Sequence, residues 1–263
     1  WHSELFSYAK EVEITIFSSP FDETAVDLLE ELNTPAYKIA SFELCDIPLI
    51  KYIAKKQKPI LMSTGMASIQ EIHEAVSTAM ENGCENLLLF HCISAYPAPV
   101  EQSNLRNLIY LRDEFELEVG LSDHTKGNTA AIAAIALGAS AIEKHFIVNR
   151  NEKGPDSEFS IEPSELKELK LITNQAWMAL GSEGFGRSKN ELKSKVFRRS
   201  LYFVKPLKKG NIVTENDIRR IRPGFGLAPK YEDQIIGRKL IKEVDRGEAV
   251  SWDMFENDSN INY

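Results

Sequence analysis

Short apolar runs and amphipathic helical patterns alternate regularly along residues 13–180 of this 263-residue chain. The apolar runs have the length of buried parallel strands and lack the strict polar alternation of a surface strand. Strand–helix alternation with short links predicts a parallel sheet covered by helices. The predicted strands are Glu13–Ser18, Ala36–Ser41, Pro59–Ser63, Leu87–Cys92, Glu118–Leu121 and Ala141–Phe146.

Helical patterns fill the segments between these runs. The segment Ser68–Asn82 begins with a serine that has Glu71 three residues later, which is the pattern of a capping box. The segment Pro163–Leu180 opens with proline, a residue favoured in the first helical turn. Further helices are predicted for Trp1–Tyr8, Glu23–Leu32, Asn104–Phe115 and Asn128–Leu137.

The number of strand–helix units indicates how the sheet is completed. A (β/α) barrel needs about eight strands to close, and the chain supplies six units, which would leave two bare edges. We therefore predict an α/β fold, a (β/α)8 TIM barrel whose first two units are missing from this chain. The alternative is a doubly wound open sheet.

The chain becomes polar and loses its apolar periodicity after residue 181. We predict a partial barrel over residues 1–181, a polar linker over residues 182–195 and a small second domain over residues 196–263. In the second domain, Thr214 or Asn216 could cap one short helix. Its predicted strands are Ser200–Val204 and Lys239–Ile241, and its turns are Lys209-Gly210, Pro223-Gly224 and Arg246-Gly247.

Composition excludes several classes of protein. The net charge is −8 and no basic run is long enough to follow a phosphate backbone, so nucleic acid is not an expected partner. No apolar run is long enough to span a bilayer, so no membrane is expected either. The three cysteines, Cys45, Cys84 and Cys92, fit no zinc pattern and are predicted to be free thiols in the cytoplasm.

Two histidines lie where consecutive predicted strands end. Side chains alternate along a strand, so Ser122 shares a face with His124, and Glu143 shares a face with His145. In a barrel the two imidazoles would meet at one rim, where a pair of imidazoles suits a divalent ion such as Mn²⁺. The alternative is that each histidine is an ordinary hydrogen-bonded residue of the core or rim.

Hydroxyl groups and one lysine follow the earlier strands. Lys38 lies inside an apolar strand, and a buried unpaired cation is expensive, so it must reach the rim or an anion. With Ser19, Ser41 and Ser63 it forms a candidate phosphate site, although such serines also serve in turns and helix caps. Asp156 lies after the last strand, in a segment that could equally be an ordinary turn.

Together these segments resemble the sialic acid synthase family, and most closely its pseudaminic acid synthase branch. Ser157 and Phe225 favour that branch, and Ser94 stands where sialic acid synthases often have asparagine. The residues that carry the resemblance are Trp1-His2, Ser18 to Phe21, Tyr37 to Glu43, Ser63 to Gly65, His91-Cys92, Tyr96-Pro97, Gly120 to His124, Gly138-Ala139, Glu143 to Phe146, Gly154 to Ser157, Arg199 to Leu201 and Arg222 to Gly226.

The resemblance implies roles for individual residues. His124 and His145 would be ligands of a divalent metal (Mn²⁺, Mg²⁺ or Co²⁺). The phosphoenolpyruvate site would consist of Lys38, Ser19, Ser41, Ser63 and Ser122, with Glu43 near it. The amino sugar would be bound by Tyr96, Asp156 and Arg222. Ser94 would be a further substrate-binding residue. The second domain would be an antifreeze-like (SAF) domain that covers the partner's barrel in a domain-swapped homodimer.

The implied reaction joins phosphoenolpyruvate to an open-chain diacetamido-trideoxyhexose, giving pseudaminic acid and phosphate. Alternatives are N-acetylneuraminate or legionaminate synthesis, a 3-deoxy sugar-acid synthase, and a non-catalytic carbohydrate- or ice-binding protein. In the family, a general-base glutamate and a second phosphate-binding lysine lie on the two strands that this chain lacks. The chain alone is therefore expected to be inactive.

Overall fold

The computed structural model describes residues 1–256, and the chain divides into two compact units, Trp1–Ser182 and Glu183–Tyr263. Residues 257–263, which end the predicted second domain, lie outside the described residues. Each unit has its own cluster of buried apolar side chains, so each unit can be understood by itself.

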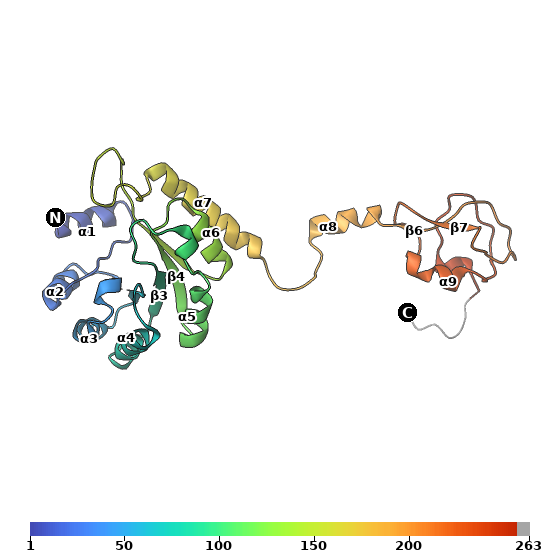
Figure 1. The fold of residues 1–263 in the computed structure, drawn as a ribbon. Helices are drawn as coiled ribbons and strands as arrows, with labels where there is room; N and C mark the ends of the chain where they lie inside the picture. The colour runs from blue at the N-terminus through green and yellow to red at the C-terminus, as the bar shows by residue number, and fades with distance from the viewer. Residues whose placement is uncertain (257–263) are drawn as a thin grey trace. The chain divides into compact units, whose positions relative to one another are not determined.

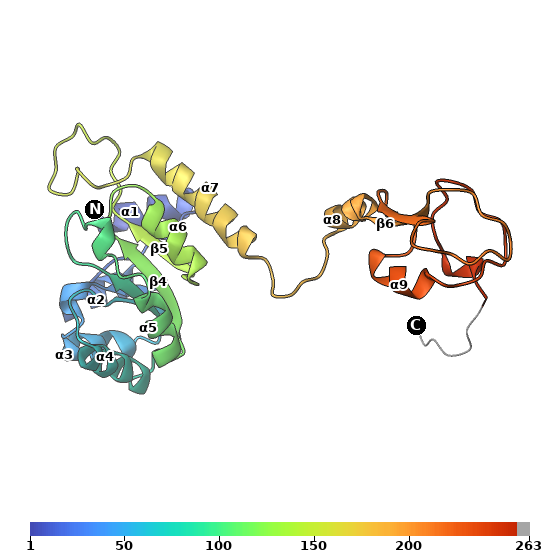
Figure 2. The same ribbon diagram turned by 45° about the vertical axis from the view of Figure 1, so that its right-hand side comes forward.

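The first unit alternates helices and strands. Its elements are α1 (His2–Glu11), α2 (Glu23–Glu31), β1 (Tyr37–Ile39), α3 (Ile47–Ala54), β2 (Ile60–Ser63), α4 (Ile69–Glu81), β3 (Leu87–Cys92), α5 (Asn107–Phe115), β4 (Glu118–Asp123), α6 (Thr129–Ala136), β5 (Ala141–Lys144) and α7 (Pro163–Leu180). The five strands form one parallel sheet in the order of the sequence. The sheet curls, and helices α2 to α6 lie around its outside (Figures 1 and 2).

The predicted α/β class and parallel sheet are therefore confirmed, and the closed eight-stranded barrel stays a prediction. One predicted strand is wrong. Within 13–18, only Ser18 pairs with the sheet, through a parallel bridge to Tyr37. Residues 13–17 pair with no described strand and are largely exposed. Glu13 also has a φ of 57°, which interrupts an extended backbone.

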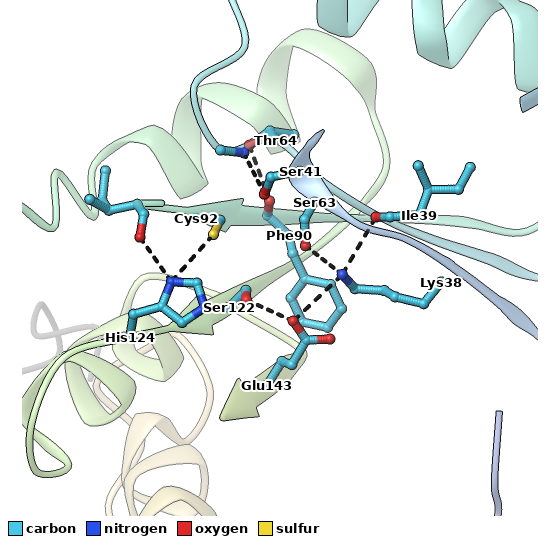
Figure 3. Close-up of polar contacts among 12 residues, drawn as sticks. Lys38, Ile39, Ser41, Ser63, Thr64, Phe90, Cys92, Ser122, His124 and Glu143 are labelled. Atoms are coloured by element: carbon cyan, nitrogen blue, oxygen red, sulfur yellow. Dashed lines mark hydrogen bonds and ion pairs between the residues drawn. The ribbon is translucent and has the colours of Figure 1, made fainter. Parts of the chain in front are cut away.

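The two faces of the sheet carry different side chains. On the outer face Tyr37, Ile39, Ile60 and Met62 are at most 1% exposed and belong to the main apolar cluster with the helices. The alternate positions, Lys38 and Ser63 among them, point to the inner face (Figure 3). Because strand side chains alternate, apolar residues lie on the outer face of the sheet, against the helices, and polar residues lie on the inner face.

The helices follow the predicted boundaries closely. The capping box is present at α4, where Ser68 Oγ accepts from Glu71 N and the Glu71 carboxylate accepts from Ser68 N. Helix α7 has the predicted bounds, and α1 extends the predicted first helix. Helix α3 was missed, although Asp46 caps it and Pro48 lies in its first turn.

The second unit contains α8 (Lys189–Lys193), β6 (Ser200–Phe203), β7 (Ile218–Ile221) and α9 (Glu232–Ile235). Strands β6 and β7 are antiparallel. The predicted strand Lys239–Ile241 is wrong, because only isolated bridges form there. The predicted helix cap is also wrong, because Thr214 closes a turn with Asp217 that leads directly into β7.

Two further predictions concern the whole chain. Cys45, Cys84 and Cys92 are free thiols, as expected. Over residues 1–256, no helix is long and apolar enough to cross a membrane.

Candidate active site

Lys38 lies at the centre of the polar inner face. The residue is 7% exposed, and its Nζ donates to Ser63 Oγ at 2.7 Å, across from β1 to β2. Nζ also lies 3.5 Å from Glu143 Oε1 and 5.7 Å from the centroid of the Phe90 ring (Figure 3). A buried ammonium with one carboxylate at the edge of contact range is well placed to attract a further anion.

Glu143 connects this lysine to the next part of the site. Its Oε1 accepts from Ser122 Oγ at 2.7 Å, so the same oxygen faces both a hydroxyl and the Lys38 ammonium. The Glu143 side chain is 39% exposed, whereas that of Lys38 is 9% exposed. The cluster is therefore more open to solvent at Glu143 than at Lys38.

Hydroxyl groups pack closely around Gly65, two residues after Ser63. The backbone N–H of Gly65 donates to Ser41 Oγ at 3.2 Å, and a side chain at Gly65 would clash with the hydroxyls of Ser41 and Ser94. The buried Ser94 Oγ and Glu43 Oε2 have no hydrogen-bond partner among the described residues. Buried polar atoms are nearly always satisfied, so these two atoms are candidates for contacts with a ligand.

The two histidines converge at the ends of β4 and β5. Their ring centroids are 5.1 Å apart with an interplanar angle of 67°. Tyr96 lies 4.3 Å from the His124 ring, and Phe159 lies 4.9 Å from the His145 ring. The two imidazoles, Tyr96 and Phe159 therefore form one aromatic cluster, called the aromatic wall below.

The hydrogen bonds fix how the imidazoles can act. His124 Nδ1 lies 2.9 Å from the carbonyl oxygen of Ile93, which can only accept, so Nδ1 carries the proton and Nε2 of the neutral ring has a lone pair. His145 Nδ1 lies 3.4 Å from Asp156 Oδ2, which favours the same tautomer. Within residues 1–256, no group of three or more His, Cys, Asp or Glu side chains could hold a metal. Two imidazoles with lone pairs fit a divalent ion whose other positions are filled by water and substrate.

Burial and close contacts shift the ionisation of this region. For His124, burial lowers the pKa, but Cys92 and the Ile93 carbonyl raise it more, so the pKa lies above the usual value. Burial raises the pKa of the Cys92 thiol, but His124 and Ser41 lower it to below its usual value. Burial and the neighbouring His124 lower the pKa of His145, which keeps that ring neutral.

The structure brings most of the predicted site residues together. Lys38, Ser63 and Ser122 share the inner face, and Ser41 and Ser94 meet beside it at Gly65. Glu43 follows β1 and has a buried carboxylate oxygen, so its place at the site stays a prediction. His124, His145, Tyr96 and Asp156 form the adjoining cluster. Ser19 follows the bridge at Ser18 and makes no described side-chain hydrogen bond. Arg222 directly follows β7 in the second unit, so its place at this site stays a prediction.

Several neighbours of these residues were not predicted. Glu143 was recognised as sharing a face with His145 but not as the partner of Lys38. Cys92 Sγ lies 3.8 Å from His124 Nδ1. Asp123 and Lys144, which directly precede the two histidines, form a buried ion pair. Strand alternation, applied to every residue at these strand ends, could have paired Asp123 with Lys144, but it could not have indicated the contact between Lys38 and Glu143.

Comparison with known proteins agrees with this geometry. The NeuB family model matches residues 1–184, and the SAF domain model matches residues 198–256. A pseudaminic acid synthase of Helicobacter pylori is 42% identical over 257 residues, covering 97% of this chain and 76% of the relative. An N,N'-diacetyllegionaminic acid synthase of Campylobacter jejuni is 41% identical over 252 residues, covering 95% and 75%.

Solved structures show the same likeness. An N-acetylneuraminic acid synthetase of Leptospira borgpetersenii superposes with a TM-score of 0.70 at 33% identity, covering 73% of this chain and 67% of that one. The spore coat polysaccharide biosynthesis protein SpsE of Bacillus subtilis gives 0.66 at 32% identity, covering 97% and 77%. The chain therefore belongs to the NeuB family and carries a SAF domain after its curled parallel sheet.

Proposed function

We propose that the protein condenses phosphoenolpyruvate with an open-chain diacetamido-trideoxyhexose, giving pseudaminic acid and phosphate. The observation that carries this proposal is the buried Lys38 ammonium on the same inner face as the His124–His145 pair. The similarity to pseudaminic acid synthases over 97% of the chain supports the choice of product.

Phosphoenolpyruvate binds beside Lys38 in this proposal. The ammonium and the Ser63 hydroxyl, which are in contact at 2.7 Å, face the phosphate. The unpartnered Ser94 hydroxyl and the Ser41 hydroxyl contribute further contacts, and Ser122 orients Glu143 at the edge of the same cluster. As the C–O bond to phosphate breaks, the Lys38 charge stabilises the negative charge on the leaving group.

The amino sugar binds against the aromatic wall. His124 and His145 would hold a divalent ion through their Nε2 lone pairs, with Mn²⁺, Mg²⁺ and Co²⁺ as candidates. When bound, that ion supplies Lewis-acid polarisation of the aldehyde oxygen. Tyr96, 4.3 Å from the His124 ring, and Asp156 border the space in which the sugar lies.

The proposed reaction balances with these components. The nucleophilic C3 of phosphoenolpyruvate attacks the aldehyde carbon, and the aldehyde oxygen gains a proton. Water adds at C2 with loss of a proton, which gives a tetrahedral carbon that carries hydroxyl and phosphate. The C–O bond to phosphate then breaks, phosphate leaves with the bonding electron pair, and the hydroxyl loses its proton as the C2 ketone forms. The unpartnered Glu43 carboxylate oxygen and Glu143 are the described groups placed to accept or hold a proton near this carbon.

The second candidate is the same chemistry with a different sugar, giving legionaminate or N-acetylneuraminate. The legionaminic acid synthase of Campylobacter jejuni is 41% identical, against 42% for the pseudaminic acid synthase of Helicobacter pylori. Ser157 does not separate these possibilities by direct contact, since its hydroxyl accepts from Gly154 N and donates to the Glu152 carbonyl within its own loop. A non-catalytic carbohydrate-binding role would leave the buried lysine and the histidine pair without a purpose.

A homodimer is also part of the proposal, with the SAF domain and Arg222 of one subunit over the site of the other. Charge favours such docking: residues 1–182 hold 14 of the 31 Lys and Arg and 27 of the 39 Asp and Glu, and residues 183–263 hold the other 17 and 12. An acidic first unit and a basic second unit attract each other. The three free thiols and the phosphoenolpyruvate substrate agree with a cytoplasmic location.

Substrate turnover tests the proposed function. The complete gene product that contains these residues is incubated with phosphoenolpyruvate, Mn²⁺ and each candidate sugar, and phosphate release and product mass are measured. We expect release that requires both sugar and metal, and a product mass equal to sugar plus phosphoenolpyruvate plus water minus phosphate. Release without sugar, or no product with any sugar, would contradict the proposal.

Matched histidine variants connect the activity to the site. His124→Ala is expected to abolish metal-stimulated turnover. His73→Ala, at an exposed histidine paired with Glu114 on the helical surface, is expected to leave it unchanged. Mixing an Arg222→Ala protein with a Lys38→Met protein tests the shared site, because a domain-swapped dimer regains active sites and a monomer does not.

A further inference from the structure

A buried ion pair lies directly behind the two histidines. Lys144 Nζ is 2.7 Å from Asp123 Oδ2, and the two side chains are 3% and 1% exposed. Asp123 and Lys144 are partners in the register between β4 and β5, and each directly precedes one of the histidines. Because side chains alternate, this pair points away from the face that His124 and His145 occupy.

The pair closes a ring around the backbone of His124. Lys144 Nζ donates to the carbonyl oxygen of Thr125 at 2.7 Å, and Asp123 Oδ1 accepts from Thr125 N at 2.9 Å. The ammonium therefore contacts the residue before His124 and the residue after it, while its own backbone leads into His145. Each histidine therefore directly follows one member of this hydrogen-bonded pair.

Stability alone does not explain such a pair. Removing two charges from water costs free energy that their attraction often fails to exceed, and apolar replacements of similar volume are commonly as stable or more stable. The ion pair also has a directional effect. Its three hydrogen bonds fix the position of the end of β4 relative to the end of β5. That relative position sets the 5.1 Å between the imidazole rings.

We propose that Asp123 and Lys144 are positioning residues that hold His124 and His145 at the separation at which both Nε2 atoms can reach one divalent cation. The inference rests on the metal role in the proposed function. Neither side chain touches metal or substrate, and both act through the backbone of the histidines. Orientation of ligands by surrounding hydrogen bonds contributes strongly to metal affinity.

A neutral, volume-matched double variant tests this. Asp123→Leu/Lys144→Met removes both charges together and leaves no unpaired ion. It also leaves the buried N–H and carbonyl of Thr125 without these partners, so its melting temperature is expected to fall, but the protein is expected to fold. Its Mn²⁺ affinity, measured by the loss of the free Mn²⁺ EPR signal, is expected to fall by about 10- to 100-fold. A structural role would move the melting temperature and leave the affinity unchanged.

The control is a second ion pair close in sequence. Lys126 and Glu158 are paired at 2.6 Å but are 57% and 70% exposed, so Lys126→Met/Glu158→Gln should keep wild-type Mn²⁺ affinity. If the buried double variant does not fold, Lys144→Arg retains the charge but displaces it, and we expect Mn²⁺ binding about threefold weaker or more.

The outcomes are separable. Wild-type Mn²⁺ affinity in a folded Asp123→Leu/Lys144→Met or Lys144→Arg protein overturns the positioning role and leaves the proposed function standing. A wild-type protein that binds no Mn²⁺ overturns the metal role, and the positioning role with it. Weaker binding in the folded buried-pair variant, together with unchanged binding in the exposed-pair control, supports the inference.

Discussion

The two units of the chain bury polar groups in different ways. In the second unit Ser200 is 1% exposed, and its hydroxyl donates to the Pro223 carbonyl and accepts from Gly226 N. In the first unit the buried Ser94 Oγ and Glu43 Oε2 have no partner among the described residues. Apart from the Tyr202 hydroxyl and residues with such local partners, the described core of the second unit is apolar.

This difference distinguishes polar groups that are buried for stability from polar groups that are buried to bind a ligand. A buried hydroxyl whose bonds are complete stabilises a turn, and it can be explained without a ligand. Buried polar atoms that have no hydrogen-bond partner lower stability unless something binds there. The inner face of the first unit is therefore organised for binding, and the core of the second unit for folding.

The largest expected effect concerns the apolar core of the second unit. Phe203 is fully buried, and Phe203→Ala should destabilise that unit by about 3–5 kcal/mol, because it leaves a cavity. Calorimetry should show one transition moved to lower temperature, with Mn²⁺ affinity of the first unit unchanged. Leu89→Ala, at a fully buried site of β3, is the matched variant and should move the other transition. If Phe203→Ala also weakens Mn²⁺ binding, the two units are not independent.

A smaller effect is expected for the buried cation. Lys38→Met should weaken phosphoenolpyruvate binding by about 10- to 100-fold, since a hydrogen bond to a charged group contributes about 1.5–3 kcal/mol. The melting temperature should hold, because an apolar side chain replaces a buried charge. Calorimetric titration measures the affinity, and Lys51→Met, at an exposed position of α3, is the control. Unchanged affinity in Lys38→Met would show that the phosphate lies elsewhere.

The smallest effect is a pH dependence in the second unit. Burial raises the pKa of Asp217, but Lys205 and Thr214 lower it more, so the folded pKa lies below the usual value near 4. Stability from this carboxylate is present above that value and is lost as the pH falls through the folded pKa. Asp217→Asn should lower the unfolding free energy at neutral pH by about 1–2 kcal/mol and flatten its acid dependence. A variant with the acid dependence of the wild type would contradict this assignment.

Much of the first unit could be predicted because its local signals agree with the fold. Ser68 and Glu71 form the capping box that their spacing indicates, and the apolar run Leu87–Cys92 is a strand with those same bounds. Lys38 could be recognised because a lysine within an apolar strand has few alternatives to a site. The two histidines could be paired because parallel strands end at the same rim.

The remaining features depend on contacts that a sequence does not display. An apolar run such as Glu13–Ser18 becomes a strand only where partners exist on the sheet, and here one bridge forms. Lys239 and Leu240 have the residue pattern of a strand but are held by bridges to two different segments. The link between Lys38 and Glu143 crosses from one edge of the sheet to the other, so no spacing in the sequence indicates it.

The central claim is that both imidazoles bind one metal ion on the same inner face as Lys38. The direct measurement is the stoichiometry of Mn²⁺ binding by EPR titration of the wild-type, His124→Ala and His145→Ala proteins. We expect one ion per chain in the wild type and a loss of tight binding in each variant. Retention of wild-type affinity in either variant would contradict the claim.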